Sequence, residues 1–160
     1  MPKNIYILVG PPGSGKSTWI ENEFPGNRYI VSTDNIIEAV ARDEGKTYNE
    51  VFTTFIKEAE PMMFSDLELY VQGGYDPIIV DRTNMNIKAR ARFLERIKQF
   101  GKKHDYKVHA VVFPKPEDEE YERRLNRPGK TIPEAVINGM LASFQMPTVE
   151  EGFTSVTVIE

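Results

Sequence analysis

A glycine-rich segment near the start of the chain has the residue types and the spacing of a phosphate-binding loop. Residues 10–17 read GPPGSGKS, which fits the pattern G-x-x-x-x-G-K-[ST], between an apolar stretch and a predicted helix that starts near Lys16. Glycines let the backbone turn so that successive N–H groups point at phosphate oxygens, and the positive end of the helix dipole strengthens the attraction. We therefore predict that this segment binds a nucleoside triphosphate.

Single residues of the loop have predicted roles in holding ATP, or another nucleoside triphosphate, together with Mg²⁺. Lys16 is expected to reach the β- and γ-phosphates and to act in catalysis, and Ser17 to give a hydroxyl ligand to Mg²⁺. The other expected nucleotide contacts in the loop are Pro12, Gly13, Ser14, Gly15 and Thr18. A glycine-rich turn that matches by chance is the alternative, and the strand and helix on either side disfavour it.

Two aspartates that follow predicted strands are candidates for the acceptor side of a phosphoryl-transfer site. A hydroxyl that attacks the γ-phosphate must lose its proton, and a carboxylate at the end of a neighbouring strand is suited to accept it. Asp34 follows residues 29–31, and Asp81 follows residues 78–80. We expect Asp34 to act in catalysis and to contact the metal, and Asp81 to support Mg²⁺ indirectly. For both, the alternative is a helix cap or a turn residue.

Three arginines, Arg123, Arg124 and Arg127, form a basic cluster in a charged run at residues 114–127. Cations there could stabilise charge on the transferred phosphoryl group. The run is predicted to be helical, and because it is poor in apolar residues we expect it to lean away from the core, as part of a lid at about residues 114–132. The alternative is a solvated helix whose arginines pair with neighbouring glutamates.

Other basic residues and both histidines are assigned no role in the site. The second basic cluster is interpreted as a solvated helix face, and it comprises Lys88, Arg90, Arg92, Arg96, Lys98, Lys102 and Lys103. His104 and His109 lack companions at the spacing of metal ligands, so we expect surface or sheet positions for them.

Five short apolar stretches predict the strands that would position these residues. They are residues 5–9, 29–31, 78–80, 108–113 and 156–159. Strands that are nearly continuous apolar runs and alternate with helices indicate a parallel sheet covered on both faces. The predicted fold class is therefore α/β, with a five-stranded parallel sheet and with ligands at the carboxyl ends of its strands.

Two of the intervening segments have clear helical features. The stretch around residues 87–100 has helical periodicity. Residues 48–72 are also helical in pattern but contain Pro61, which lacks a backbone donor, so we expect two helices or one bent helix there. Gly73 and Gly74 are suited to end that region because a left-handed backbone often follows a helix.

Composition is that of a soluble globular protein with one domain over residues 1–160. The chain has 40% hydrophobic and 28% charged residues, and it has no cysteine, which excludes disulfides and thiolate chemistry. No signal peptide and no apolar run long enough for a membrane span are found, so we expect a cytoplasmic location. A net charge of -4 argues against coating nucleic acid, although local Arg and Lys could still grip a strand end.

Nearly the whole chain resembles the polynucleotide 5′-hydroxyl kinases, the kinase domain of phage and animal end-healing enzymes. The resemblance rests on five segments: GPPGSGKSTW at 10–19, the STD that ends at Asp34, VDRTNMN at 80–86, RRLNRPGKTIP at 123–133 and FQMPTVEEGF at 144–153. It implies the P-loop kinase fold with an arginine-bearing lid. It also implies ATP and Mg²⁺ as cofactors and 5′-hydroxyl ends of nucleic acid as the substrate.

The resemblance also implies roles for single residues. Asp34 matches the general base that activates the 5′-hydroxyl, Arg127 matches the lid arginine that holds the γ-phosphate, and Arg123 matches a second phosphate contact. The residues that match the lining of the acceptor pocket are Asp81, Arg82, Thr83 and Asn84.

The chain departs from the phage pattern at Ile37, where phage enzymes carry an arginine for the phosphate 3′ to the reactive nucleotide. Arg82 is a hypothetical substitute for that charge. These enzymes usually carry a phosphatase domain with a D-x-D motif, and because this chain has none we expect no 3′-phosphatase activity.

We therefore expect an ATP-dependent kinase that phosphorylates 5′-hydroxyl ends of DNA or RNA. One alternative is a kinase of the same fold with a small-molecule acceptor, such as a nucleoside, a sugar or the nucleotide sugars of zeta-toxin-like kinases. The acidic net charge mildly favours that alternative. A second alternative is a nucleotide-binding module without catalysis, in which Asp34 would be a cap and the lid an interface.

Overall fold

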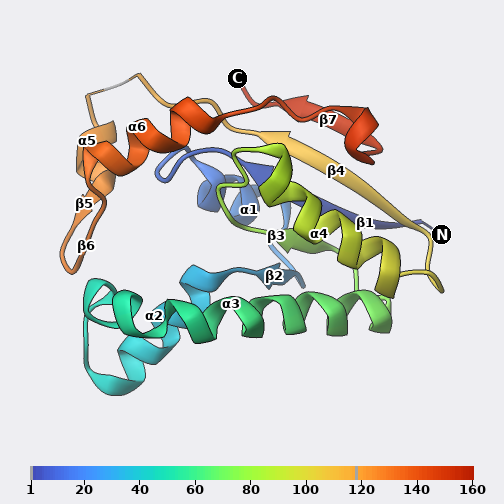
Figure 1. Cartoon of the computed structure of the whole chain (residues 1–160), viewed down its shortest axis with the longest axis horizontal. Helices are drawn as coiled ribbons and strands as arrows, with labels where there is room; N and C mark the ends of the chain where they lie inside the picture. Colours follow the sequence, from blue (N-terminus) through green and yellow to red (C-terminus); the bar gives the residue numbers. More distant parts are fainter. Residues whose placement is uncertain (1, 118) are drawn as a thin grey trace.

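A five-stranded parallel sheet forms the centre of the computed structural model, which describes residues 2–117 and 119–160 (Figure 1). The strand order is β2-β3-β1-β4-β7, and every neighbouring pair is parallel. The strands are β1 (Lys3–Val9), β2 (Tyr29–Val31), β3 (Ile78–Val80), β4 (Tyr106–Val112) and β7 (Ser155–Val158). The predicted α/β class and the five-stranded parallel sheet are confirmed, and each predicted strand overlaps an observed one.

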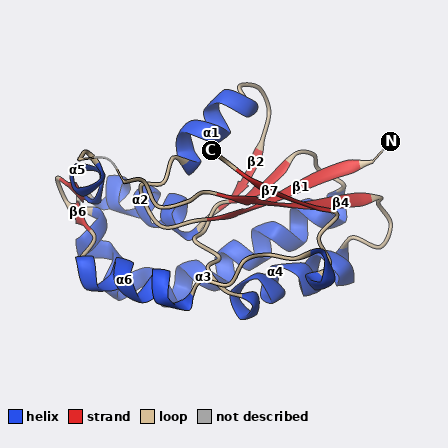
Figure 2. Ribbon diagram, turned by 90° about the horizontal axis from the view of Figure 1, so that it is seen from above, coloured by secondary structure: helices blue, strands red, loops and turns tan. Residues whose placement is uncertain are grey.

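Helices cover both faces of the sheet (Figure 2). One face packs against α1 (Lys16–Glu23), and the other packs against α3 (Tyr48–Gly73) and α4 (Ile87–Phe100). Ile7 and Leu8 of β1 are both fully buried, but Ile7 belongs to the cluster with α3 and α4 and Leu8 to the cluster with α1. This alternation explains why the strands read as continuous apolar runs.

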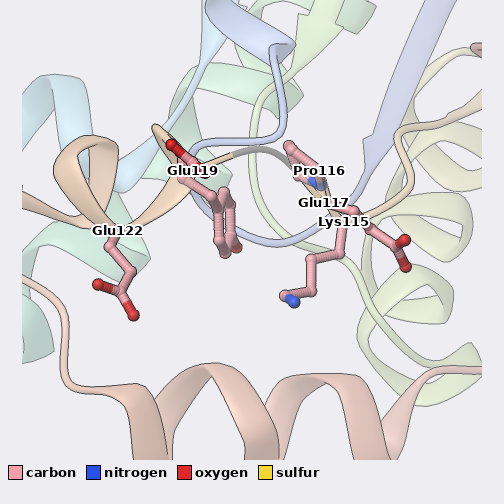
Figure 3. Close-up of a pocket in the computed structure, with 6 residues that line it drawn as sticks. Lys115, Pro116, Glu117, Glu119 and Glu122 are labelled. Atoms are coloured by element: carbon pink, nitrogen blue, oxygen red, sulfur yellow. The ribbon is translucent and has the colours of Figure 1, made fainter.

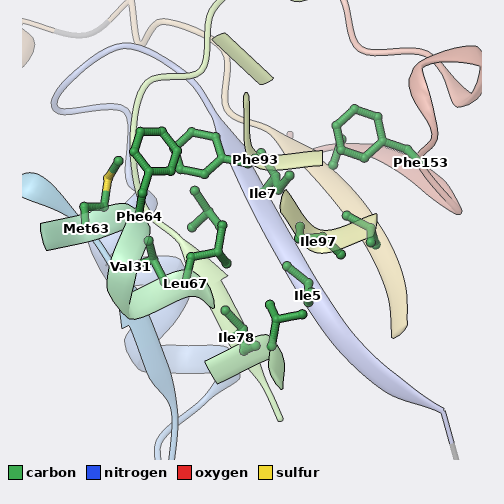
Figure 4. Close-up of a cluster of buried hydrophobic side chains, with 14 residues drawn as sticks. Ile5, Ile7, Val31, Met63, Phe64, Leu67, Ile78, Phe93, Ile97 and Phe153 are labelled. Carbon is green, nitrogen blue, oxygen red and sulfur yellow. The ribbon is translucent and has the colours of Figure 1, made fainter. Parts of the chain in front are cut away.

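The larger core cluster lies between the sheet and helices α3 and α4 (Figure 4). The sheet contributes residues such as Ile5, Val31 and Ile78, and the helices contribute Leu67 and Phe93 among others. Burying each such side chain contributes roughly 1.5–3 kcal/mol to folding. A smaller apolar cluster of Ile37, Ala41, Val51 and Ala59 joins α2 (Thr33–Glu44) to α3.

The segments that follow the carboxyl ends of the strands are tied together by backbone hydrogen bonds. Gly10, directly after β1, donates its N–H to the carbonyl of Thr83 beyond β3, at 2.9 Å. Asp81, directly after β3, donates its N–H to the carbonyl of Val31 at the end of β2, also at 2.9 Å. The predicted ligand-binding edge of the sheet is therefore a connected set of loops.

α3 continues through Pro61 as one helix, which excludes two separate helices, the first of the two predicted alternatives. Proline removes one backbone hydrogen bond, but the turns around it are held by the buried side chains of Ala59, Met63 and Phe64. Gly74 ends the helix at φ 70°, as predicted for the residue after Gly73.

The segment between β4 and β7 is built from short elements rather than one helix. They are α5 (Tyr121–Leu125), β5 (Asn126–Arg127), β6 (Lys130–Thr131), α6 (Glu134–Ser143) and the 3-10 helix η1 (Val149–Glu151). We use the word lid for α5, the β5-β6 hairpin and α6.

The predicted helix over residues 114–127 is wrong except for α5; residue 118 lies outside the described residues. Pro114 and Pro116 have no backbone N–H, so a helix over this segment would lack hydrogen-bond donors at both positions. Inside the lid, Tyr121, Leu125 and Ile137 form a small buried cluster of their own. In the part of the chain that the structure describes, no helix is both long and apolar enough to cross a membrane.

Candidate active site

The loop after β1 has the backbone geometry that phosphate binding requires. Gly13 and Gly15 adopt φ values of 74° and 97°, a left-handed region that favours glycine. α1 begins at Lys16 with Gly15 as its N-cap, and no side chain caps this end of the helix. The first-turn N–H groups of α1 are thus left for a ligand at its positive end.

Two further features of the loop fit a phosphate group. The hydroxyl oxygen of Ser14 is buried and has no hydrogen-bond partner among the described residues. The side chain of Lys16 is buried, and its Nζ donates to the carbonyl of Gly10 at 2.7 Å. The loop therefore holds a cation and an unsatisfied hydroxyl inside a turn of uncapped amides, which is a donor set for an anion.

Burial lowers the pKa of Lys16 to about 8, because desolvation disfavours its charged form. The carboxylates of Asp81 and Asp34 act in the opposite direction, and Lys130 and Arg82 add to the lowering. These interactions place the loop lysine, both candidate aspartates and a lid residue in one electrostatic neighbourhood. An incoming phosphate would favour the charged form of Lys16 in the same way as the aspartates do.

Asp34 does not cap α2. The N-cap is Ser32, whose Oγ accepts the N–H of Asn35 at 3.3 Å, so the alternative reading of Asp34 as a cap is excluded. The Asp34 side chain lies in the first turn of the helix and is 53% exposed. Its Oδ1 accepts a hydrogen bond from the hydroxyl of Tyr48 at 2.5 Å, and its Oδ2 lies 3.4 Å from the Nζ of Lys130.

Lys130 lies among side chains of α2 and α3. Its Nζ lies 3.3 Å from Oε1 of Glu38, as well as close to Asp34, and 4.2 Å from the centre of the Tyr48 ring. Only 13% of its side chain is exposed. The lid hairpin therefore reaches the first turn of α2 and the start of α3.

Asp81 is not a helix cap either, because Asn86 caps α4 and accepts the N–H of Ala89 at 2.9 Å. Burial raises the pKa of the Asp81 carboxyl, and the charge of Lys16 opposes that rise. A partly buried carboxylate that interacts with the charge of the loop lysine is consistent with a role next to a bound cation.

Asn84 stabilises the loop after β3. It is 3% exposed, has a positive φ of 48°, and donates its side-chain amide to the carbonyl of Leu8 at 2.9 Å. We therefore interpret Asn84 as a support of this loop rather than as a substrate contact. Its neighbours Arg82 and Thr83 are partly exposed.

The lid packs on the phosphate-binding loop through Tyr121, which the sequence did not single out, and through Arg124 of the predicted arginine cluster. The hydroxyl of Tyr121 donates to the carbonyl of Pro12 at 2.9 Å, and NH1 of Arg124 donates to the carbonyl of Gly13 at 3.1 Å. Of the three lid arginines, Arg124 is thus the one with a measured contact to the loop, whereas Arg123 was predicted to be a nucleotide contact. Arg123 is exposed in the last turn of α5.

Arg127 is exposed in β5 and lies directly opposite Lys130 across the hairpin. Opposed residues of an antiparallel pair project from the same face. Arg127 therefore projects from the face of the hairpin that carries Lys130 to Asp34, although no contact between Arg127 and the phosphate-binding loop is seen. Pro128 and Gly129 form the turn, with Gly129 at φ 77°.

A shallow cavity of about 490 Å³ opens where the lid leaves β4 (Figure 3). Its lining is Lys115, Pro116, Glu117, Glu119, Tyr121 and Glu122. Three carboxylates and one lysine disfavour a phosphate at this place. We therefore place the phosphate site at the loop after β1 and not in this cavity. Tyr121 connects the two, because it lines the cavity and contacts Pro12 of the loop.

The residues present fit a nucleotide with Mg²⁺. Within residues 2–117 and 119–160, no group of three or more His, Asp or Glu side chains could hold a metal by itself. Mg²⁺ bound with a nucleotide takes one or two protein ligands and completes its octahedron with phosphates and water. Ser17 and Asp34 stay the predicted metal contacts, and for Asp34 the ammonium of Lys130 at Oδ2 is a competitor.

Sequence reasoning missed three residues of the site: Tyr48, Tyr121 and Lys130. A local signal existed for two of them. The capping box of Thr47 and Glu50 marks Tyr48 as the first residue of α3, and the Pro-Gly turn after Arg127 predicts a hairpin that would place Lys130 opposite it. Ile37, noted as a departure from the phage pattern, is fully buried in the cluster between α2 and α3.

A family model described as AAA domain matches residues 5–147 of the chain. Among curated proteins, the chain is 25% identical over 158 residues to the bifunctional polynucleotide phosphatase/kinase of Schizosaccharomyces pombe, covering 96% of this chain and 33% of that protein. It is 27% identical to transcription factor bHLH140 of Arabidopsis thaliana and 26% identical to mouse heterogeneous nuclear ribonucleoprotein U-like protein 2. Those matches cover 95% and 89% of this chain but 15% and 20% of the relatives.

Solved structures with the same fold include proteins described as kinases. A provisionally assigned kinase from Chloroflexus aurantiacus has a TM-score of 0.66 at 13% identity, with 99% of this chain and 88% of that chain covered. A structure from the PezAT toxin–antitoxin system of Streptococcus pneumoniae has a TM-score of 0.67 at 20% identity, covering 99% and 68%. A sugar kinase from Janibacter has a TM-score of 0.53 at 16% identity, covering 99% and 85%. These likenesses establish a P-loop kinase-like fold.

Proposed function

The chain belongs to the AAA domain family, and we propose that it is an ATP-dependent kinase that transfers the γ-phosphate to 5′-hydroxyl ends of DNA or RNA. The observation that carries the proposal is the position of the Asp34 carboxylate. Ser32 caps α2, so Asp34 does not, and the charge of Asp34 acts on Lys16 of the phosphate-binding loop. The likeness to the polynucleotide phosphatase/kinase of Schizosaccharomyces pombe supports this choice of acceptor.

In the proposed reaction, the loop amides and Lys16 bind the phosphates of ATP and fix the γ-phosphorus. Asp34 orients the acceptor hydroxyl and takes its proton. A bond forms between the acceptor oxygen and the γ-phosphorus while the bond from that phosphorus to the β–γ bridging oxygen breaks, and ADP leaves. Mg²⁺ bound with the nucleotide would neutralise phosphate charge, with Ser17 as its proposed protein ligand.

Residues around this centre take supporting roles in the proposal. Arg127 would approach the γ-phosphate from the lid, because it shares a hairpin face with Lys130. Arg123 is a proposed second phosphate contact. Asp81, Arg82 and Thr83 border the loop on the acceptor side and are the proposed neighbours of the nucleic-acid end, with Arg82 as the proposed phosphate-binding cation.

A small-molecule hydroxyl is the second candidate acceptor. Glu38 lies beside Asp34 at the same lysine, so the acceptor side carries more carboxylate than the sequence predicted. Excess negative charge disfavours a polyanionic strand and is tolerable for a neutral sugar or nucleoside. The relatives described as a transcription factor and a ribonucleoprotein leave room for a binding module without turnover.

The experiment that tests the proposal offers γ-labelled ATP with several acceptors in parallel: 5′-hydroxyl DNA, 5′-hydroxyl RNA, nucleosides, sugars and nucleotide sugars. Label on the nucleic acid alone is the expected result. Label on a small molecule alone would reverse the choice of acceptor, and no transfer to any acceptor would favour the binding module.

Asp34→Ala tests the catalytic assignment in the same assay. We expect turnover to be lost while ATP binding, measured by calorimetry, stays at the wild-type level. Asp105→Ala is the matched control, because Asp105 is an exposed aspartate at the opposite end of β4. Full turnover in Asp34→Ala would remove Asp34 from the mechanism.

A further inference from the structure

We propose that Tyr48 and Lys130 are positioning residues that clamp the Asp34 carboxylate toward the acceptor, and that Lys130 makes the clamp depend on the seating of the lid hairpin. The inference rests on the proposed function, since it requires that Asp34 receives the acceptor proton. Tyr48 belongs to no motif by which the sequence predicts the site, and Lys130 lies in the RRLNRPGKTIP segment without a predicted role.

Each oxygen of the Asp34 carboxylate has its own partner. The hydroxyl of Tyr48 donates to Oδ1 at 2.5 Å, and the ammonium of Lys130 lies 3.4 Å from Oδ2. Burial and the hydrogen bond to Asp34 raise the pKa of Tyr48, so its hydroxyl stays a donor throughout the physiological range. Two partners from separate elements, α3 and β6, determine the plane of the carboxylate where one partner would leave it free to rotate.

Lys130 is held in place by more than its ion pair with Asp34. Its Nζ also contacts Glu38 at 3.3 Å and lies over the Tyr48 ring at 4.2 Å. The hairpin turn is fastened beside it, because the N–H of Asn49 donates to the carbonyl of Gly129 at 3.0 Å. The lysine therefore reaches Asp34 only while the hairpin lies against the start of α3.

The exposure of the Asp34 side chain shows whether Tyr48 and Lys130 orient the carboxylate or shield it from solvent. A lysine that masked Asp34 would bury it, but 53% of the Asp34 side chain is exposed with both partners in place. An ionised carboxylate has about four acceptor positions, and Tyr48 and Lys130 use two of them. An acceptor hydroxyl can therefore hydrogen-bond Asp34 while the clamp is closed.

The lid joins the two substrate sides. Its α5 contacts the phosphate-binding loop through Tyr121 and Arg124, while its hairpin contacts Asp34 through Lys130. When the lid packs on the phosphate-binding loop, its hairpin therefore also orients Asp34, the proposed base. We expect the clamp to act on the transfer step rather than on nucleotide affinity.

The test measures transfer to a 5′-hydroxyl oligonucleotide by wild type, Tyr48→Phe, Lys130→Met and the double variant. Each single change should lower kcat about 10-fold with KM for ATP unchanged, because a base that is misoriented by a fraction of an ångström loses part of its rate advantage. The double variant should lose only about as much as the more affected single variant, since both residues act through one carboxylate. Lys130→Arg, which retains the charge, should keep most of the activity.

Tyr106→Phe is the matched control, because it removes a hydroxyl that donates to the carbonyl of Tyr75 at 2.7 Å at the amino end of β4. It should transfer phosphate at the wild-type rate. The clamp is overturned if both single variants stay within about twofold of wild type, if their losses multiply, or if KM for ATP rises instead of kcat falling.

Asp34→Asn separates a failure of the clamp from a failure of the proposed function. If Asp34→Asn transfers phosphate at the wild-type rate, the proposed base is wrong and the clamp is wrong with it. If Asp34→Asn is inactive while Tyr48→Phe and Lys130→Met are unimpaired, the base stands and only the clamp is refuted.

Discussion

Arg90 and Glu151 form a buried two-point ion pair that holds the last part of the chain against the loop after β3. Nε of Arg90 donates to Oε1 of Glu151 at 2.9 Å and NH2 to Oε2 at 3.2 Å, with side-chain exposures of 0% and 7%. NH1 of Arg90 donates to the carbonyl of Asn84 at 2.9 Å. The assignment of Arg90 to a solvated basic face is therefore wrong.

This pair gives a structural reason for the FQMPTVEEGF segment at residues 144–153. Gln145 adds a second link, because its N–H donates to the carbonyl of Met85 at 2.8 Å and its side chain accepts the N–H of Ile87 at 3.0 Å. The segment thus stabilises the loop that begins at Asp81. Since the carbonyl of Thr83 in that loop accepts the N–H of Gly10, the support extends to the phosphate-binding loop.

Arg90→Met is expected to lower the free energy of unfolding by about 3–5 kcal/mol, because it leaves a buried carboxylate without its partner. Arg92→Met is the matched control on the same helix, where the ion pair with Glu60 is exposed and contributes at most about 1 kcal/mol. Urea denaturation of both variants measures the difference. Equal losses in the two variants would contradict a structural role for the buried pair.

We expect the protein to lose stability in mild acid because of His109. Burial lowers its pKa below 6.5, and its ring nitrogens lie 2.7 Å from Oγ of Ser155 and 3.0 Å from Oδ1 of Asn4 while the ring stacks on Tyr6. Below pH 6.5 the unfolded chain binds a proton that the folded chain does not, so the free energy of unfolding falls as pH falls toward the lowered pKa.

Urea denaturation from about pH 7.5 to about pH 5 measures this contribution. His109→Gln should reduce the slope because glutamine does not titrate. An unchanged slope in His109→Gln would show that other groups cause the acid sensitivity.

The sheet and the phosphate-binding loop were predictable because their signals are local. Buried parallel strands are continuous apolar runs, and the loop pattern specifies both its glycines and its lysine within eight residues. Pro61 shows the limit of local signals. Propensity predicts that a proline divides or bends a helix, but the turns around Pro61 stay in one helix because their side chains pack in the core.

The acceptor side was predictable only in part, because its contacts join distant segments. Ser32, Thr33 and Asp34 are all competent helix caps, and no rule on the sequence selects Ser32 among them. Tyr48 and Lys130 meet Asp34 from segments that are far apart in the sequence, and neither has a periodic pattern that marks it. In the sequence, Arg90 cannot be told apart from the other cations of its helix, because its partner Glu151 is 61 residues away.

Gly129 and Gly139 allow a test of lid seating with one kind of substitution at two positions. A Cβ at Gly129 would lie 2.8 Å from Cβ of Thr47, and φ of 77° strains any larger residue. Thr47 cannot easily yield, because it caps α3 by accepting the N–H of Glu50 at 3.3 Å. Gly129→Ala is therefore expected to push the hairpin off the start of α3.

The displaced hairpin would withdraw Lys130 from Asp34, so we expect Gly129→Ala to lower the transfer rate about 10-fold and to speed tryptic cleavage after Lys130, since the bond after Arg127 precedes a proline. Gly139→Ala in α6, where a Cβ meets nothing within 4 Å, should transfer at the wild-type rate and gain about 0.5–1 kcal/mol of stability from helix propensity. If both alanine variants transfer phosphate at the wild-type rate, the contact between hairpin and α3 has no part in the reaction, and lid seating must be controlled by α5 at the phosphate-binding loop instead.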